Sequence, residues 1–228
     1  MKANGMVGKL YSVFDFIYRL IYLNFLWFSF TLIGAFIFGF GPSTIALYHV
    51  TRKWIKKELG NDKHIFKEYF KIYKANFVRA NIIGLTVMLV YFMFLVNYRY
   101  ATLRSEFIFQ FIRIAMVIFA IITTVVCSYL APLYVHYELT IKEYFQQSFI
   151  FAVGHPLITL LNVAWLIIFS YLFDILFPFS LLIGVSSLAY GLMGISYSLF
   201  IRNDQMVEEK FGQPLKINKV KEKKHRAI

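Results

Sequence analysis

The sequence predicts an all-α membrane protein, a polytopic bundle of about five transmembrane helices with two amphipathic helices on its cytoplasmic side. Composition is the first reason, because 59% of the 228 residues are hydrophobic and only 16% are charged. A soluble domain typically carries about 25% charged residues. The second reason is that the apolar residues form runs of about 20, the length that a helix needs to cross the hydrocarbon core of a bilayer.

Five apolar segments account for the predicted transmembrane helices. They are residues 20–40, 80–98, 114–135, 157–177 and 179–201. The first is long for a signal-peptide core and no small-residue cleavage pattern follows it, so we interpret it as a retained span. Only Pro178 separates the last two, whose combined length is too great for one crossing, and this predicts a hairpin turn near residues 174–178. The predicted membrane domain is therefore 1–201, followed by a basic cytoplasmic tail at 202–228.

The distribution of lysine and arginine predicts the orientation of the chain. Eight of these residues lie at 52–74, between the first two spans, and eight follow the last span. With five spans both basic segments fall on one side, which the positive-inside rule places in the cytoplasm. We therefore predict a multi-pass protein of the cell membrane with its N-terminus outside and its C-terminus cytoplasmic, although Lys2, Lys9 and Arg19 precede the first span. This asymmetry explains the net charge of +12, so no nucleic-acid partner is predicted.

Two segments between the spans have the periodicity of amphipathic surface helices. The apolar face of the first is Phe66, Tyr69, Phe70, Tyr73 and Phe77, with Lys67, Lys71 and Lys74 opposite, and that of the second is Ile141, Tyr144, Phe145, Ser148 and Phe149. We expect these faces to pack on neighbouring spans or among lipid headgroups, or else to dock a partner protein. Both segments contain Lys-Glu-Tyr-Phe, at 67–70 and 142–145, which predicts a parallel repeat of span, surface helix and span.

The predicted spans hold few side chains suited to chemistry. Three interior asparagines stand out, Asn24, Asn81 and Asn162, and we interpret them as interhelical contacts or as part of a substrate site. The histidines do not have the spacing of a zinc site, and no phosphate loop, nucleophile elbow or carboxylate pair is evident. We therefore predict no catalytic, cofactor-binding or metal-binding residues, and no enzymatic activity.

Several polar, glycine and proline positions resemble the YesL-like family of bacterial integral membrane proteins, which carry a domain of unknown function. The resemblance is carried by Gly8-Lys9-Leu10-Tyr11, Tyr22-Leu23-Asn24, Trp27, Gly41-Pro42-Ser43-Thr44, Trp54, Tyr73-Lys74-Ala75-Asn76-Phe77, Ala80-Asn81 and Gly84. It is best over residues 8–90. It implies a cell-membrane protein that is commonly encoded near carbohydrate uptake systems and sensor kinases, with no established activity, catalytic residue or cofactor.

We expect an accessory or regulatory membrane protein that serves a carbohydrate transport or sensing system. Its expected partners are the lipid bilayer and a transporter or sensor-kinase subunit. The alternative is a small autonomous membrane transporter, which the predicted repeat and the interior asparagines favour. Uptake into liposomes, compared between the wild type and Asn24→Leu or Asn81→Leu, distinguishes the two.

Overall fold

The computed structural model describes residues 6–59 and 62–211, and these residues form helices without any strand. Eight helices follow one another in this part of the chain: α1 (Met6–Ile33), α2 (Ile37–Ile55), α3 (Asp62–Ala75), α4 (Phe77–Thr102), α5 (Phe107–His136), α6 (Ile141–Gly154), α7 (Pro156–Ile175) and α8 (Ser180–Phe211). The predicted all-α fold class is confirmed.

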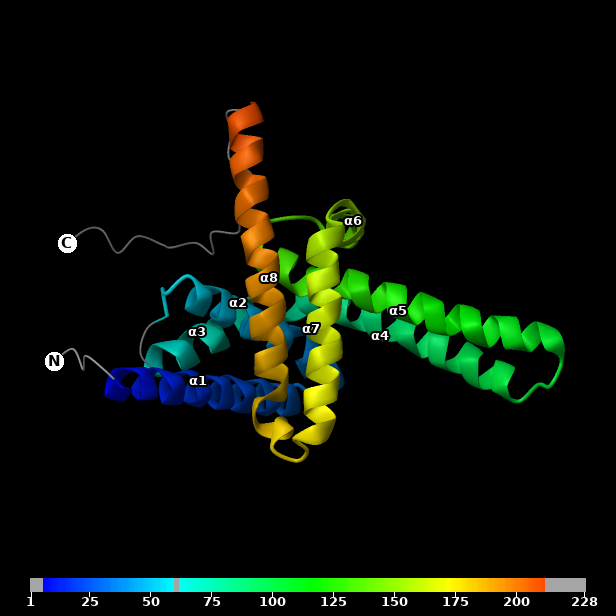
Figure 1. The fold of residues 1–228 in the computed structure, drawn as a ribbon, viewed down its shortest axis with the longest axis horizontal. Helices are drawn as coiled ribbons and strands as arrows, with labels where there is room; N and C mark the ends of the chain where they lie inside the picture. The colour runs from blue at the N-terminus through cyan, green and yellow to red at the C-terminus, as the bar shows by residue number, and fades with distance from the viewer. Residues whose placement is uncertain (1–5, 60–61, 212–228) are drawn as a thin grey trace.

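The helices are arranged around α2, which contacts α1, α3, α4, α5 and α8 (Figure 1). The hairpin of α4 and α5 projects far to one side of the molecule, and the hairpin of α7 and α8 runs crosswise to it. The turn at 176–179 joins α7 to α8, as the position of Pro178 predicts. Within each hairpin the two long helices lie side by side, and α2 lies where the hairpins meet.

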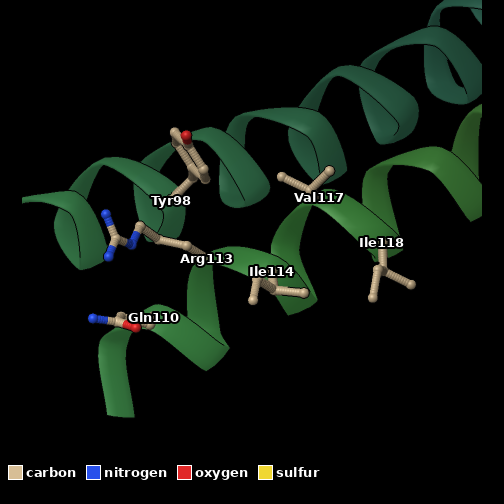
Figure 2. Close-up of a pocket in the computed structure, with 6 residues that line it drawn as sticks. All are labelled: Tyr98, Gln110, Arg113, Ile114, Val117 and Ile118. Atoms are coloured by element: carbon tan, nitrogen blue, oxygen red, sulfur yellow. The ribbon is translucent and has the colours of Figure 1, made fainter. Parts of the chain in front are cut away.

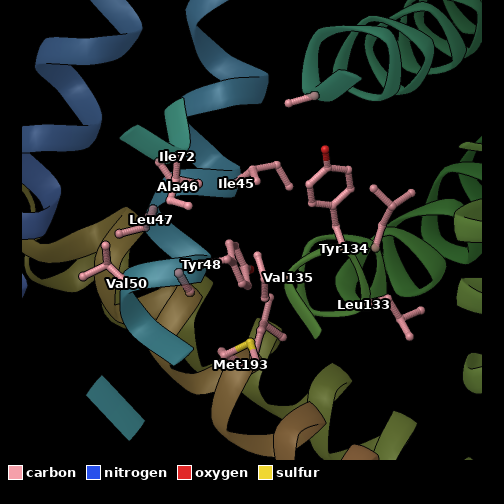
Figure 3. Close-up of a cluster of buried hydrophobic side chains, with 14 of the residues drawn as sticks. Ile45, Ala46, Leu47, Tyr48, Val50, Ile72, Leu133, Tyr134, Val135 and Met193 are labelled. Atoms are coloured by element: carbon pink, nitrogen blue, oxygen red, sulfur yellow. The ribbon is translucent and has the colours of Figure 1, made fainter. Parts of the chain in front are cut away.

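The interior of the protein lies where α2 meets the C-terminal end of α5 and the middle of α8. Residues 45–51 of α2 are buried without interruption, so this helix is surrounded on all sides. Figure 3 shows Tyr48 of α2 beside Val135 of α5 and Met193 of α8. Burial of such side chains typically contributes about 1.5–3 kcal/mol each. We conclude that the two hairpins join the core through the C-terminal end of α5 and the middle of α8.

The first predicted span differs from the structure at its C-terminal end. The apolar run at 20–40 is divided, because α1 ends at Ile33 and α2 begins at Ile37. Ala35 and Phe36 between them have positive φ angles of 53° and 61°, which reverse the chain. A Cβ atom on Gly34 would lie 2.2 Å from the Cα atom of Gly39, so only glycine fits there. Because the turn residues are themselves apolar or small, hydropathy does not reveal the break.

Five helices are long and apolar enough to cross a membrane: Gly8–Ile33, Phe77–Thr102, Phe107–His136, Pro156–Ile175 and Ser180–Glu209. Their side chains face mostly outward, since only 17% of the most apolar stretch of α4 and 6% of that of α7 is buried. Outward apolar faces of this extent require a lipid environment. The predicted number of spans is therefore confirmed.

The predicted boundary between the membrane domain and the basic tail, at residue 202, lies within a helix. Helix α8 continues without a break to Phe211, well beyond the end of the predicted span at 201. The remaining part of the predicted basic tail, 212–228, lies outside the described residues.

Both predicted surface helices are present, as α3 and α6. Helix α3 buries Ile65, Tyr69, Ile72 and Tyr73, whereas Phe66 and Phe70 lie half exposed at the edge of the buried face. The side chains of Lys67, Lys71 and Lys74 are exposed. Helix α6 begins with a capping box: Thr140 Oγ1 accepts from the Glu143 N–H, and Glu143 accepts from the Thr140 N–H.

The repeated Lys-Glu-Tyr-Phe segments place their tyrosines in similar environments. Tyr69 and Tyr144 are almost fully buried, with 0% and 1% of their surfaces exposed. The Tyr69 hydroxyl donates to the Ser43 carbonyl of α2 at 2.8 Å, and the Tyr144 hydroxyl donates to the carbonyl of Tyr137, just after α5, also at 2.8 Å. Each tyrosine thus fixes a short helix to the preceding long helix. That the two halves form a true repeat stays a prediction.

Candidate functional site

The three predicted asparagines lie between three different pairs of helices. Asn24 on α1 donates to the Leu181 carbonyl at 2.7 Å and accepts from the Ser186 N–H at 3.3 Å, so it joins α1 to α8. Asn81 is buried on α4 beside α2, and its Oδ1 atom has no hydrogen-bond partner among the described residues.

Asn162 is the only residue of α7 that is fully buried. Its amide lies beside the Tyr129 hydroxyl of α5 without reaching hydrogen-bond geometry. Tyr129 is instead paired with Thr159 of α7 at 2.9 Å. The structure therefore shows the asparagines at separate helix contacts and does not bring them together into one site.

A polar junction of Arg52, His136, Tyr137, Asn203 and Asp204 forms where α2, α5 and α8 meet. The Nε2 atom of His136 lies 2.9 Å from one carboxylate oxygen of Asp204, and the Tyr137 hydroxyl donates to the other at 2.8 Å. His136 and Tyr137 are 2% and 5% exposed, so these bonds are shielded from water. The junction fixes the end of α5 to the distal part of α8.

Arg52 completes the junction from the α2 side. Its guanidinium donates to the Val135 carbonyl at 3.1 Å, near the C-terminal end of α5, where unpaired carbonyls carry partial negative charge. Its positive charge also interacts with Asp204, so an anion and a cation are both enclosed in the junction. Burial, reinforced by Asp204, raises the pKa of Tyr137, whose phenol therefore stays protonated as a donor.

Chemically, the junction resembles a structural clamp more than a catalytic centre. A buried histidine with an aspartate partner is able to accept and release a proton, but no serine or cysteine nucleophile is bonded to His136 among the described residues. Those residues also contain no cluster of three or more His, Cys, Asp or Glu that fits a metal ion. The arrangement holds helices in register.

A second polar cluster joins α3 to α2. The Nε2 atom of His49 lies 3.3 Å from Oε1 of Glu68, and the ammonium of Lys53 pairs with the same oxygen. Burial on its own would raise the pKa of this carboxyl. The hydrogen bonds from His49 and Lys53 outweigh burial and lower the pKa of Glu68 from 4.5 to about 2.

The lowered pKa of Glu68 makes stability depend on pH in a defined direction. Ionised Glu68 stabilises the fold above pH 4.5, and this contribution is lost as the pH falls from 4.5 to about 2. We expect Glu68→Gln to lower the melting temperature at neutral pH. We also expect the melting temperature of this variant to fall less than that of the wild type between pH 4.5 and about 2. Melting curves in detergent across this pH range measure the effect, with Glu106→Gln, an exposed carboxylate, as the control. If the melting temperatures of the wild type and Glu68→Gln fell equally over this pH range, ionised Glu68 would not be stabilising the fold.

A third cluster surrounds Arg79 at the start of α4. Its guanidinium donates to the Leu139 carbonyl and lies over the rings of Tyr134 and Tyr144, 6.0 and 5.6 Å from their centroids. The Tyr134 hydroxyl donates to Asn76 Oδ1 at 2.9 Å. This cluster therefore joins the link between α3 and α4 to the link between α5 and α6.

Two hollows on the surface of the spans combine a cation with apolar walls. One of about 440 Å³ lies between α4 and α5 near the turn that joins them. Figure 2 shows Tyr98 of α4 facing Arg113 and Val117 of α5 across it. The other, of about 550 Å³, lies where the link between α6 and α7 meets α8, and Arg202 lines it.

Sequence reasoning did not find the polar junction. His136 and Asp204 are 68 positions apart and share no motif with each other. The one available signal is that both lie near predicted cytoplasmic ends of spans, where polar side chains are common. Pairing them requires knowing that α5 and α8 meet at those ends.

Comparison with known proteins places this arrangement in a family. A family model described as "Protein of unknown function, DUF624" matches residues 20–98. The uncharacterized protein YteU of Bacillus subtilis (strain 168) is 30% identical over 218 residues, which cover 94% of this chain and 93% of YteU. YesV and YesL of the same organism are each 30% identical and cover 83% and 84% of this chain, with 92% and 89% of their own lengths matched. No solved structure matches the chain.

The five apolar helices and their outward-facing surfaces define a multi-pass helical membrane protein. The chain belongs to the DUF624 family of YesL-like proteins, whose function is unknown. The predicted family resemblance is therefore confirmed over nearly the whole length of the chain.

Proposed function

We propose that this protein is a non-enzymatic accessory or regulatory subunit of a membrane system for transport or sensing, and that the distal end of α8 is its docking arm. The arm is residues 205–211. Figure 1 shows that this end of α8 stands clear of the other helices. The observation that carries the proposal is the junction at Asp204, which fixes the base of the arm to α5.

The exposed side chains of the arm are suited to contact a protein partner. Met206 is 43% exposed, and Glu208 and Glu209 are exposed without an ion pair to another described residue. A helix fixed at its base loses little conformational freedom when it binds, which favours association. An apolar residue beside two carboxylates offers the partner both contact area and a charge to recognise.

Three polar side chains at helix contacts support a role without chemistry, whereas Asn81 and Asn162 keep amide atoms without a partner among the described residues. The Asn24, Glu68 and Asp204 side chains are each engaged with another helix. Polar groups engaged in this way stabilise helix packing and are not free to bind a substrate. This argument favours the accessory role over the autonomous transporter.

The proposed setting is the cell membrane, with the C-terminus and the arm in the cytoplasm and the N-terminus outside. The excess of lysine and arginine between 52 and 74 and after 201 supports this orientation. Membership of the YesL-like family supports a carbohydrate transporter or a sensor kinase as the class of partner.

Reversing the charge of the arm tests the proposal. The full chain is purified from its native membrane in mild detergent, and co-purifying transporter or kinase subunits are identified by mass spectrometry. We expect the double variant Glu208→Lys, Glu209→Lys to lose most of the partner, since opposed charges at an interface become like charges.

The double variant Glu106→Lys, Asp174→Lys carries the same charge change far from the arm and serves as the control. It is expected to retain the partner. Equal recovery from both double variants, or the absence of any transporter or kinase subunit with the wild type, would contradict the proposed function.

A further inference from the structure

The hollow between α7 and α8 has a built polar end and an apolar side. Its volume is about 550 Å³, and its lining includes His155 before α7, Leu157 in the first turn of α7, and Ser198, Arg202 and Met206 of α8. Its walls come from two helices that are each long and apolar enough to cross a membrane. The hollow lies at the start of the α7 span and near the end of the α8 span.

The polar end of the hollow is positively charged and lacks an internal counter-ion. Within the described part of the chain, neither Arg202 nor His155 forms an ion pair. The first turn of α7 begins at Pro156 and directs unpaired backbone N–H groups and a partial positive charge to the same end. A guanidinium, an imidazole and a helix terminus together suit a phosphate group.

The apolar side of the hollow restricts what kind of phosphate compound fits. Leu157 is 76% exposed and Ile158 is partly exposed, so both offer apolar surface next to the charged end. A free anion or a sugar phosphate would leave this surface unused, whereas an acyl chain would cover it. Basic pockets between transmembrane helices on the cytoplasmic side are known to take acidic lipid headgroups.

We propose that this hollow binds one anionic phospholipid, with its phosphate at Arg202 and the first turn of α7 and an acyl chain along Leu157 and Ile158. The site holds the start of α7 against α8 and determines which lipid surrounds this end of the bundle. It does not depend on the proposed docking role, because Arg202 and the first turn of α7, which hold the lipid, lie outside the arm.

Lipid retention by the purified full chain tests the proposal. The protein is titrated in mild detergent with phosphatidylglycerol or phosphatidylcholine, and bound lipids are counted by native mass spectrometry. We expect the wild type to retain one phosphatidylglycerol in preference to phosphatidylcholine. The double variant Arg202→Gln, His155→Ala should reduce that preference about tenfold, the loss expected when charge-assisted hydrogen bonds are removed.

Two further variants make the outcome decisive. Arg99→Gln removes a cation at the far end of α4 and is expected to retain the lipid. Leu157→Trp fills the hollow from an exposed position without removing a charge, and is expected to lose the lipid while the protein stays monodisperse. Equal retention by the wild type and the Arg202→Gln, His155→Ala variant would overturn the proposal. Displacement of the lipid by millimolar inorganic phosphate would also overturn it, since the site would then recognise a free anion.

Discussion

Replacing Asp204 with alanine is expected to lower the free energy of unfolding by about 3 kcal/mol, the cost of leaving two buried hydrogen-bond donors without their acceptor. The carboxylate accepts from His136 and from Tyr137, and both donors, which are 2% and 5% exposed, would be left without this acceptor. Each unsatisfied buried group costs about 1–3 kcal/mol. The midpoint of unfolding in a titration with sodium dodecyl sulfate measures the change.

The matched control for Asp204 is Asp15, which pairs with Arg19 one turn along α1 at 2.8 Å. Their side chains are 40% and 23% exposed, so the pair is partly in contact with solvent. Asp15→Ala is expected to change stability by less than about 1 kcal/mol. If Asp204→Ala were as mild as this control, the junction would not be holding α8 against α5. Loss of the partner protein from Asp204→Ala would further connect the junction to the arm.

Replacing Gly41 with valine is expected to separate α2 from α4 and to destabilise the fold by about 3 kcal/mol, the upper part of the range for overpacked cores. A Cβ atom at this position would lie 2.5 Å from the Ala80 carbonyl oxygen, which is backbone and cannot rotate away. Gly84 lies opposite, since its own Cβ would be 3.3 Å from the Gly41 Cα atom. Ala80 and Gly84 therefore form a small-xxx-small surface on which Gly41 packs.

Gly154 provides the control for this substitution, because no atom lies within 4 Å of a Cβ built there. Gly154→Ala at the end of α6 is expected to stay within about 0.5 kcal/mol of the wild type. The resistance of each variant to proteolysis in detergent measures the effect. If the Gly41→Val variant were as resistant to proteolysis as the Gly154→Ala variant, the close contact between α2 and α4 would not be required for a stable fold.

The elements that sequence analysis predicted correctly are those that depend on short stretches of chain. The hairpin at Pro178 and the two short helices with their buried tyrosines follow from hydrophobic runs and helical spacing. Prediction was less successful at residues 34–36, since Gly34, Ala35 and Phe36 have the hydropathy of a span although their backbone turns. It therefore missed α2 as a separate helix, and with it the centre of the fold.

Among the candidate site residues, the asparagines were recognised from their polarity alone, but their partners were not. Asn24 contacts Leu181 and Ser186 from the other end of the chain, 157 and 162 positions away. Asp204 was not singled out, because a carboxylate just beyond a predicted span is ordinary in composition. Its importance comes from the two buried donors that α5 presents to it.

The sequence by itself determined that this protein lies in a membrane and that five of its segments are apolar and long enough to cross it. It also determined that these spans contain few ionisable side chains. Those properties follow from hydropathy summed over about 20 neighbouring residues, which needs no knowledge of packing. Only the tertiary structure decided that α2 fills the centre, that His136, Tyr137 and Asp204 join α5 to α8, and that a charged hollow opens beside α7. These features depend on contacts between helices far apart in the chain, where geometry and not composition selects the partners.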